Sequence, residues 1–183
     1  MKDEGERRKG IALWPAVDVV LHWRLSSPAT GIAREVRMLL EENKRLVQRL
    51  YDEGLNRQDA RAGAAFYALN AKNHGREVGR AGMQKVFEML FSVFPDFNYR
   101  IEESTAEDDR VVCRVLMTGT HRGQPKLPDV FGGMLKGVAP TGKSVRVLQF
   151  HCFRIAGGEI TEHAAVRDDL GMLQQLGIVT RPA

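Results

Sequence analysis

The sequence predicts an α+β fold, with helices in the N-terminal half and antiparallel strands in the C-terminal half. Up to about residue 94, apolar residues recur at the spacing of an amphipathic helix. From Phe97 onward apolar and polar residues alternate, which is the pattern of a half-buried strand. Because the helices precede the strands instead of alternating with them, we expect the helices to pack on one face of a curved antiparallel meander.

Three helices are expected in the first half of the chain. The first covers residues 32–53, where apolar side chains recur on one helical face. Asp59 is a suitable N-cap for a second helix that reaches residue 67. The third covers residues 82–94 and ends before Pro95, which cannot continue a helix.

Four strands and a short helix are expected in the second half. The strands cover residues 97–102, 110–120, 144–155 and 159–167, and the helix covers residues 170–176. A long Gly- and Pro-containing connection spans residues 123–142 and includes the apolar side chains of Phe131 and Met134. Because loops of this length in compact domains are usually functional or disordered, we expect a flap whose apolar residues contact a ligand.

Composition indicates one soluble globular domain. The chain has 183 residues, of which 43% are hydrophobic and 27% charged, with a formal net charge of +4. Lys and Arg are scattered among Asp and Glu, so we expect no nucleic-acid partner. Cys113 and Cys152 both lie in strand-like apolar runs, which favours buried, reduced thiols.

The first 40 residues differ in character from the rest. Residues 6–31 loosely resemble a signal peptide, but Pro15 and Asp18 interrupt the apolar run. We therefore expect residues 1–40 to form an irregular or partly helical extension and residues 41–180 to form the domain. A cytoplasmic protein without a membrane partner is the expected outcome.

Gln149 and His151 are the first candidates for chemistry. They are two residues apart on a predicted strand and so share one face with Phe153. If that face lines a cavity, its polar groups need partners, which an oxygen-containing ligand would supply. The alternatives are that this face is exposed to solvent or that His151 is a core histidine with internal partners.

His163 and Asp168 are the second pair of candidates. Strict alternation places them on opposite faces of the strand, although the strand ends near Arg167 and Asp168 has room to turn inward. Asp168 or Asp169 is also a suitable N-cap for the last helix. We expect Asp168 to be the acid/base, His163 to line the cavity wall and Asp169 to cap the helix.

Two further histidines are weaker candidates for ligand contact. His74 lies on the loop that enters the third helix, and His121 ends a predicted strand. No histidine has the spacing of a metal-ligand motif, so no metal site is expected.

Several short motifs, in order, resemble those of one family. They include N-H-G-R-E-V-G-R-A-G-M before the third helix, M-T-G-T-H-R-G at a strand end, H-C-F-R-I-A-G-G-E-I-T-E-H in a hairpin and R-D-D-L-G-M-L-Q-Q-L-G at the end. Together they make residues 42–179 resemble a SnoaL-like polyketide cyclase, of the nuclear transport factor 2-like superfamily. Ala164 departs from the family pattern, which has Trp after this histidine.

The resemblance implies a cone, in which the curved sheet and the N-terminal helices surround one deep cavity, and a homodimer formed through the sheet. It implies ring closure by intramolecular aldol condensation without a cofactor, on a hydrophobic small molecule with carbonyl or hydroxyl oxygens. Asp168 matches the family's acid/base, and Gln149 and His151 match the side chains that hold the substrate or its enolate. His163 matches the histidine of the family's E-H-W motif.

Two other functions suit the same fold. One is a non-catalytic small-molecule binding protein, because a fold does not fix a function. The other is an isomerase or epoxide hydrolase. The epoxide hydrolase requires an Asp-Arg-Asp constellation, for which the adjacent Arg167 and Asp168 would have to face the same side.

Overall fold

The computed structural model describes residues 28–125 and 134–180. The chain divides into two compact units that meet between Met38 and Leu39. In the first unit the described residues belong to the start of the helix α2 (Pro28–Arg49), which begins four residues before the helix expected from residue 32. The second unit contains the sheet and all remaining elements.

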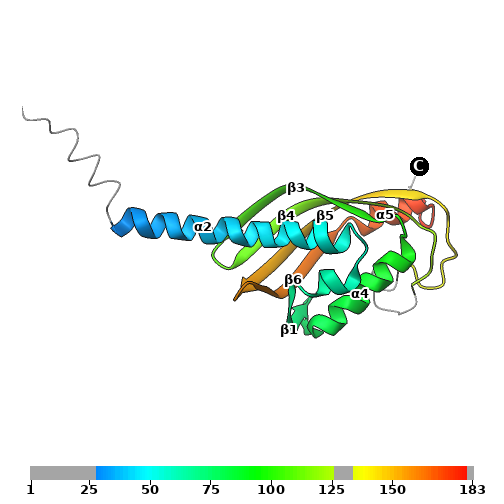
Figure 1. Cartoon of the computed structure of the whole chain (residues 1–183). Helices are drawn as coiled ribbons and strands as arrows, with labels where there is room; N and C mark the ends of the chain where they lie inside the picture. The colour runs from blue at the N-terminus through cyan, green and yellow to red at the C-terminus, as the bar shows by residue number, and fades with distance from the viewer. Residues whose placement is uncertain (1–27, 126–133, 181–183) are drawn as a thin grey trace, which may run out of the picture. The chain divides into compact units, whose positions relative to one another are not determined.

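The second unit follows the predicted order of helices before strands, with two additional strands between the helices (Figure 1). After α2 come η1 (Leu50–Leu55), α3 (Ala60–Ala64), β1 (Tyr67–Asn73), β2 (Arg76–Glu77), α4 (Gly79–Val93), β3 (Asn98–Glu107), β4 (Arg110–Thr120), β5 (Ser144–Ala156), β6 (Glu159–Arg167) and α5 (Asp169–Leu176). The expected strands therefore become β3 to β6, and the α+β class is confirmed.

The six strands form one mixed sheet in the order β2-β1-β6-β5-β4-β3. β1 pairs in parallel with β6, whereas all other neighbours are antiparallel. The sequence did not predict β1 or β2, and the helix expected to reach residue 67 ends at Ala64. Its N-cap, Asp59, was predicted correctly and accepts a hydrogen bond from Ala62 N. The burial of β1 does not alternate, because two exposed residues follow one another in Y-A-L-N-A-K-N, so the pattern lacks the strand period.

A tight turn joins β1 to β2 and places a histidine at the sheet edge. Asn73 pairs with Arg76, and the two residues between them, His74 and Gly75, have φ values of 49° and 78°. Two successive positive φ values are those of a type I′ hairpin turn. Glycine adopts this conformation freely, whereas His74 is held there by the turn and by a 2.8 Å hydrogen bond from its N–H to His163 O.

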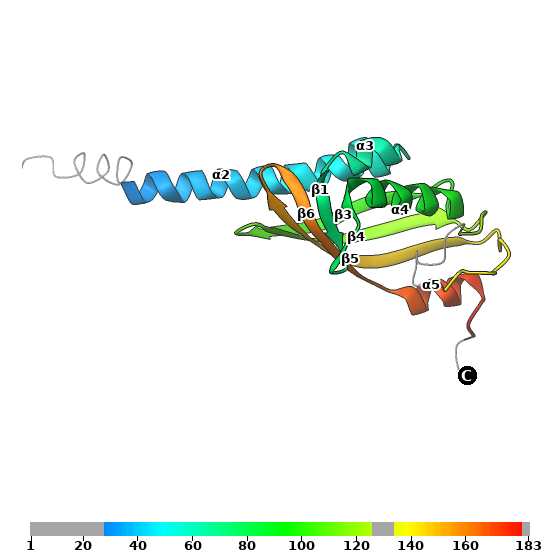
Figure 2. The ribbon, with the colours of Figure 1, turned by 90° about the horizontal axis from the view of Figure 1, so that it is seen from below.

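Helices α3 and α4 lie together on one side of the central strands, and α5 lies near the other side (Figure 2). Buried side chains alternate along β4 and β5, which gives each strand one core face. The core between them and the helices consists mainly of aliphatic and aromatic residues, including Leu50, Met83, Phe87, Val115 and Phe153.

The opposite face of β4, β5 and β6 is less well covered. Large apolar side chains are exposed there, namely Val112, Leu148, Phe150 and Val166. Phe150 is 50% exposed, and the register places it between Arg114 and Val166. We call these four residues the outer sheet face. None of the helices in the described segments has both the length and the apolar character needed to span a bilayer.

Close contact between η1 and α3 depends on glycine. A Cβ at Gly54 would collide with the Cα of Gly63, so the two backbones approach too closely for any side chain. This contact fixes η1, which carries Tyr51 and Leu55 toward the interior, where both are buried.

We expect Gly54→Ala to lower the free energy of unfolding by about 1–3 kcal/mol, the typical cost of overpacking a core. Urea unfolding followed by circular dichroism measures the change. Gly31→Ala, in α2, is the matched control, since its Cβ would meet no atom within 4 Å. Equal free energies of unfolding for the two variants would show that the close Gly54–Gly63 contact does not require glycine for stability.

Candidate functional site

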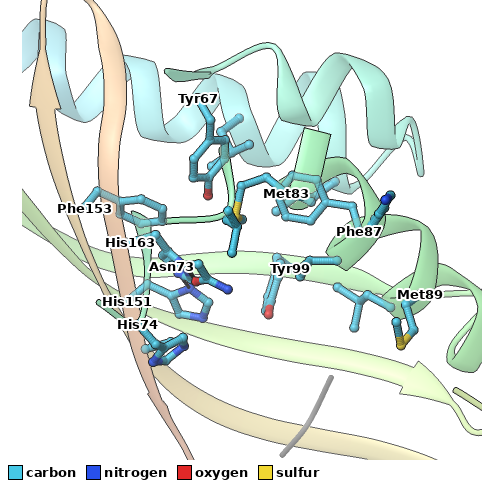
Figure 3. Close-up of a pocket in the computed structure, with 18 of the residues that line it drawn as sticks. Tyr67, Asn73, His74, Met83, Phe87, Met89, Tyr99, His151, Phe153 and His163 are labelled. Carbon is cyan, nitrogen blue, oxygen red and sulfur yellow. Dashed lines mark hydrogen bonds between the residues drawn. The ribbon is translucent and has the colours of Figure 1, made fainter. Parts of the chain in front are cut away.

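A cavity of about 700 Å³ opens into the second unit, within the range of pockets that hold drug-sized ligands. Its 22 described lining residues come from η1, α4 and strands β1, β2, β3, β5 and β6, with one from the β1–β2 turn and one, Val78, at the N-cap of α4. The apolar part is formed by Leu50, Tyr51, Leu55, Tyr67, Met83, Val86, Phe87, Met89, Leu90 and Phe153. Figure 3 shows Met83, Phe87 and Met89 on the α4 side, and His74, His151 and His163 on the other side, where Phe153 lies beside them.

The polar end of the cavity is a continuous chain of hydrogen bonds across the sheet. Asn73 Oδ1 lies 2.9 Å from His163 Nδ1, and His163 Nε2 lies 3.0 Å from His151 Nδ1. His151 Nε2 lies 2.9 Å from Gln149 Oε1, which also accepts a 2.9 Å hydrogen bond from the Tyr99 hydroxyl. The chain thus joins side chains from β1, β6, β5 and β3.

The register of the sheet explains why these side chains meet. Asn73 of β1 is paired with His163 of β6, and Phe153 of β5 lies opposite His163. His151, two residues before Phe153, shares its face and reaches His163 diagonally. Ala165, directly opposite His151, is small enough to leave that space open.

Proton counting shows that this chain has two states. Its three links that involve ring nitrogens each require one hydrogen, but two neutral imidazoles supply only two. With both amide oxygens accepting, as Asn73 and Gln149 do, the pair of rings holds one extra proton. Turning either amide end for end lets its NH₂ donate to the neighbouring ring, which restores two neutral rings. Turning Gln149 exchanges its 3.3 Å contact from Nε2 to Met117 Sδ for this bond, and the Tyr99 hydroxyl then accepts from the amide instead of donating to it. The chain can therefore take up or release one proton while remaining connected.

The surroundings favour the neutral state. Burial lowers the pKa of His151 to about 3, assisted by the positive charges of Arg167 and His74. Burial also lowers the pKa of His163 well below its usual value, with smaller contributions from His151, His74 and Arg167. At neutral pH the two rings are thus uncharged and available to accept a proton.

Positive charge dominates the lining. Among the 22 lining residues are Arg76, Lys85 and Arg167, and none is Asp or Glu. Arg167 Nε lies 3.2 Å from Asp169 Oδ1, an ion pair that orients the guanidinium from outside the lining. Burial raises the pKa of Tyr99, so its hydroxyl remains a neutral donor. Within the described ranges no three His, Cys, Asp or Glu side chains are grouped as a metal would require.

Five of the residues predicted from the sequence lie in this cavity: Gln149, His151, His163, His74 and Phe153. Gln149 and His151 are 1% and 6% exposed, so their face looks inward and not to solvent. His163 does more than line the wall, because it connects His151 to Asn73.

Asp168 lies outside the cavity lining. It is the N-cap of α5, exposed, and its Oδ1 accepts a 2.8 Å hydrogen bond from Gly171 N. The expectation that Asp169 caps this helix is therefore wrong. Strand alternation explains the placement, since Arg167 faces the cavity and the next residue leaves on the other side.

The remaining predicted contacts fall elsewhere. His121 is fully buried but packs on Phe94, with 5.9 Å between ring centroids, and its Nδ1 lies 3.3 Å from Thr141 Oγ1. Met134 packs against the core and is not a lining residue. Phe131, and with it much of the expected flap, lies outside the described residues.

Three site residues were not selected from the sequence: Asn73, Tyr99 and Arg167. Tyr99 shares a strand face with Phe97 and Ile101, and Arg167 shares one with His163. The strand period therefore contained the signal for both residues. Asn73 could not be assigned, because the strand that carries it was not predicted.

The neutral histidine pair predicts how stability depends on pH. The unfolded chain binds protons at its histidines below about pH 6.5, whereas the folded pair remains neutral to much lower pH. The unfolding free energy should therefore fall as pH decreases from 6.5 toward 5, by about 1.4 kcal/mol per pH unit for each such histidine.

His151→Gln should make this decrease less steep, as measured by urea unfolding at three pH values in that interval. His74→Asn is the comparison variant, because asparagine tolerates the left-handed turn, and it should change the slope less than His151→Gln, since burial lowers the pKa of the exposed His74 by a smaller amount. An identical pH dependence in wild type and His151→Gln would contradict a buried neutral pair.

Comparisons with known proteins agree with this architecture. AclR of Streptomyces galilaeus, a candidate hydroxylase, is 27% identical, with a TM-score of 0.64 over 79% of this chain and 86% of its own. A SnoaL-like protein of Jannaschia sp. CCS1 is 26% identical, with a TM-score of 0.64 over 78% and 95%. IdmH of Streptomyces antibioticus, a candidate polyketide cyclase, is 26% identical, with a TM-score of 0.59 over 74% and 98%.

A comparison with curated proteins finds no match. The family model described as SnoaL-like polyketide cyclase matches residues 45–176, which include every lining residue of the cavity. The chain therefore belongs to the SnoaL-like polyketide cyclase family.

Proposed function

We propose that this protein is a cofactor-independent cyclase that closes a carbon–carbon bond within a polyketide-like substrate by aldol condensation. The observation that carries the proposal is the buried, hydrogen-bonded pair of His151 and His163 at the polar end of a largely apolar cavity. Family membership and the similarity to IdmH support the same reaction class.

In the first step the histidine pair acts as the base. When Asn73 Oδ1 accepts from His163 and the Gln149 amide is turned, the lone pair resides on His151 Nε2. The substrate's α-carbon proton takes the place of the Gln149 contact and is transferred to this nitrogen. The pair then holds one extra proton, which the intact chain accommodates.

The developing enolate oxygen needs hydrogen-bond donors. The Tyr99 hydroxyl and the Gln149 amide are both buried beside His151, where the low dielectric strengthens their hydrogen bonds. The positive charge of Arg167 on the same wall adds attraction for the anion.

In the second step the enolate carbon attacks a second carbonyl of the same molecule. A carbon–carbon bond forms, the carbonyl π bond breaks, and the resulting alkoxide takes the proton back from the histidine pair. The reaction is balanced without an oxidant, reductant or added group. The apolar wall contributes by holding the folded substrate so that the two carbons are close.

The cavity is less suited to epoxide hydrolysis. That reaction was expected to require two aspartates around an arginine, and the described lining offers Arg167 without any carboxylate. A binding protein without chemistry remains the competing reading, and it differs from a cyclase in one measurable property, which is base strength toward a bound carbon acid.

We expect the full chain to accelerate hydrogen–deuterium exchange at the α-carbon of β-tetralone, an apolar ketone, followed by proton NMR. His151→Gln should slow the catalysed exchange by about 10²- to 10⁴-fold, the usual contribution of a positioned base. Asp168→Asn should retain near wild-type exchange, because it lies outside the cavity and asparagine also caps helices.

The reverse result, with exchange lost in Asp168→Asn and kept in His151→Gln, would return the acid/base role to Asp168. Binding of β-tetralone without faster exchange in the wild type would favour a binding protein.

We also propose that the outer sheet face, formed by Val112, Leu148, Phe150 and Val166, is covered by a second copy of the chain. Ion pairs border this face, including Arg114 with Glu102 at 2.9 Å and Arg154 with Asp109 at 3.0 Å. An apolar centre with a charged rim is the usual composition of a protein interface.

Phe150→Arg should therefore convert a dimer to a 20.5 kDa monomer in light scattering after size exclusion. Leu69→Arg, at a still more exposed apolar residue on β1, is the control and should leave the mass unchanged. A wild-type mass of one chain would rule out this interface.

A further inference from the structure

The exposed lining residues at the cavity mouth are unusual in charge. His74, Arg76 and Lys85 lie there, on the β1–β2 turn, β2 and α4, and none of the lining residues that the structure describes is acidic. We propose that the cavity mouth binds an acidic group, a carboxylate or sulfonate, on an otherwise apolar ligand. This inference deepens the proposed function by assigning a substrate class, and its ligand-binding part holds even for a non-catalytic protein.

Neighbouring cations show that the two mouth charges differ from ordinary surface charges. Lys72 and Arg80, which do not line the cavity, are paired with carboxylates: Lys72 Nζ lies 3.9 Å from Glu162, and Arg80 Nη2 lies 2.5 Å from Glu159. Over the described residues, no ion pair forms at Arg76 or Lys85. In the segment from β1 to α4, the cations outside the cavity are thus paired with carboxylates, whereas Arg76 and Lys85 at the cavity mouth are available to bind an anion.

Arg167 extends this positive region inward. Its guanidinium lines the cavity, while Asp169 holds it from outside the lining and offsets part of its charge. The positive charge of Arg167 contributes to the lowered pKa of His74, His151 and His163. An acidic group bound at the mouth would counter that charge and make the histidine pair a stronger base.

The cavity dimensions suit such a ligand. About 700 Å³ accommodates two or three fused or linked aromatic rings, and the apolar side chains of Met83, Phe87 and Met89 lie on the side away from the histidines (Figure 3). A ligand with its rings against Met83 and Phe87 would place an acidic substituent within reach of Lys85, which lies between these two residues in the sequence of α4.

Two dyes with the same rings test this inference. Anilinonaphthalene sulfonate carries a sulfonate, and phenylnaphthylamine is the same skeleton without it. We expect fluorescence titration of the full chain to give about fivefold or tighter binding of the sulfonate, since each exposed ion pair contributes up to about 1 kcal/mol. The preference should shrink from about 20 mM to about 500 mM salt, as the Debye length falls from roughly 20 to 4 Å.

The double variant Arg76→Gln, Lys85→Gln should lose the preference and bind phenylnaphthylamine as before. The control double variant Arg100→Gln, Arg146→Gln removes the same charge from exposed residues outside the cavity and should keep the preference. Equal binding of both dyes to the wild type, or loss of preference in the control, would overturn the inference.

Further variants test whether the dyes bind inside the cavity and whether binding is independent of catalysis. Val86→Trp and Ala165→Leu each narrow the cavity, so binding of both dyes should weaken, and unchanged binding in both variants would place the dyes elsewhere and refute the inference. His151→Gln should abolish carbon-acid exchange but keep the sulfonate preference. Failure of catalysis and failure of the acidic-ligand site are therefore distinguishable.

Discussion

The contact between His151 and His163 constrains the whole polar end of this cavity. Two imidazoles buried in an apolar interior must satisfy four ring nitrogens, and the protein does so with Asn73 at one end and Gln149 at the other. Asn73 requires the parallel pairing of β1 with β6, and the contact between the two histidines requires the antiparallel pairing of β5 with β6, whereas Gln149 lies two residues from His151 on β5 itself. A slip of one residue in either register would turn half of the chain toward the outer face and leave buried nitrogens unpaired.

The surrounding charges then determine the protonation state of this histidine pair before a substrate reacts. A carboxylate beside an imidazole raises the pKa of that ring. The ring is then protonated at neutral pH and acts as an acid instead of a base. Here the positive charge of Arg167 in the lining acts in the opposite direction and, with burial, keeps the rings neutral. An enolate formed in the cavity reverses the balance, because its negative charge stabilises the protonated pair. The site therefore needs no carboxylate in its lining to remove a proton, provided that the anion it creates remains close.

Sequence periodicity predicted the elements whose two faces differ in environment. β4 and β6 begin and end at the expected residues, and the inward placement of Gln149, His151 and His163 follows from alternation along β5 and β6. β1 was not predicted, because its burial pattern lacks alternation. For the same reason the role of Asn73 and the left-handed turn at His74 were not predicted. The diagonal meeting of His151 with His163 also depends on strand register, which no single strand's pattern contains. Periodicity thus identifies which side chains face inward, whereas pairing between distant strands decides which of them meet.

The different positions of Arg167 and Asp168 show why this distinction matters for function. The two residues are adjacent, both are charged, and the family resemblance favours the aspartate as acid/base. Alternation directs the arginine into the cavity, while the aspartate accepts a hydrogen bond from one free amide of the first turn of α5, that of Gly171, at the surface. Moving Asp168 inward would remove that cap and require the strand to continue for one more residue out of phase. A side chain that a helix start already requires is poorly placed to move during a catalytic cycle, whereas the histidine chain changes its protonation by turning one amide. The chemistry is therefore better assigned to the residues whose hydrogen bonds can be exchanged without unfolding a local structure.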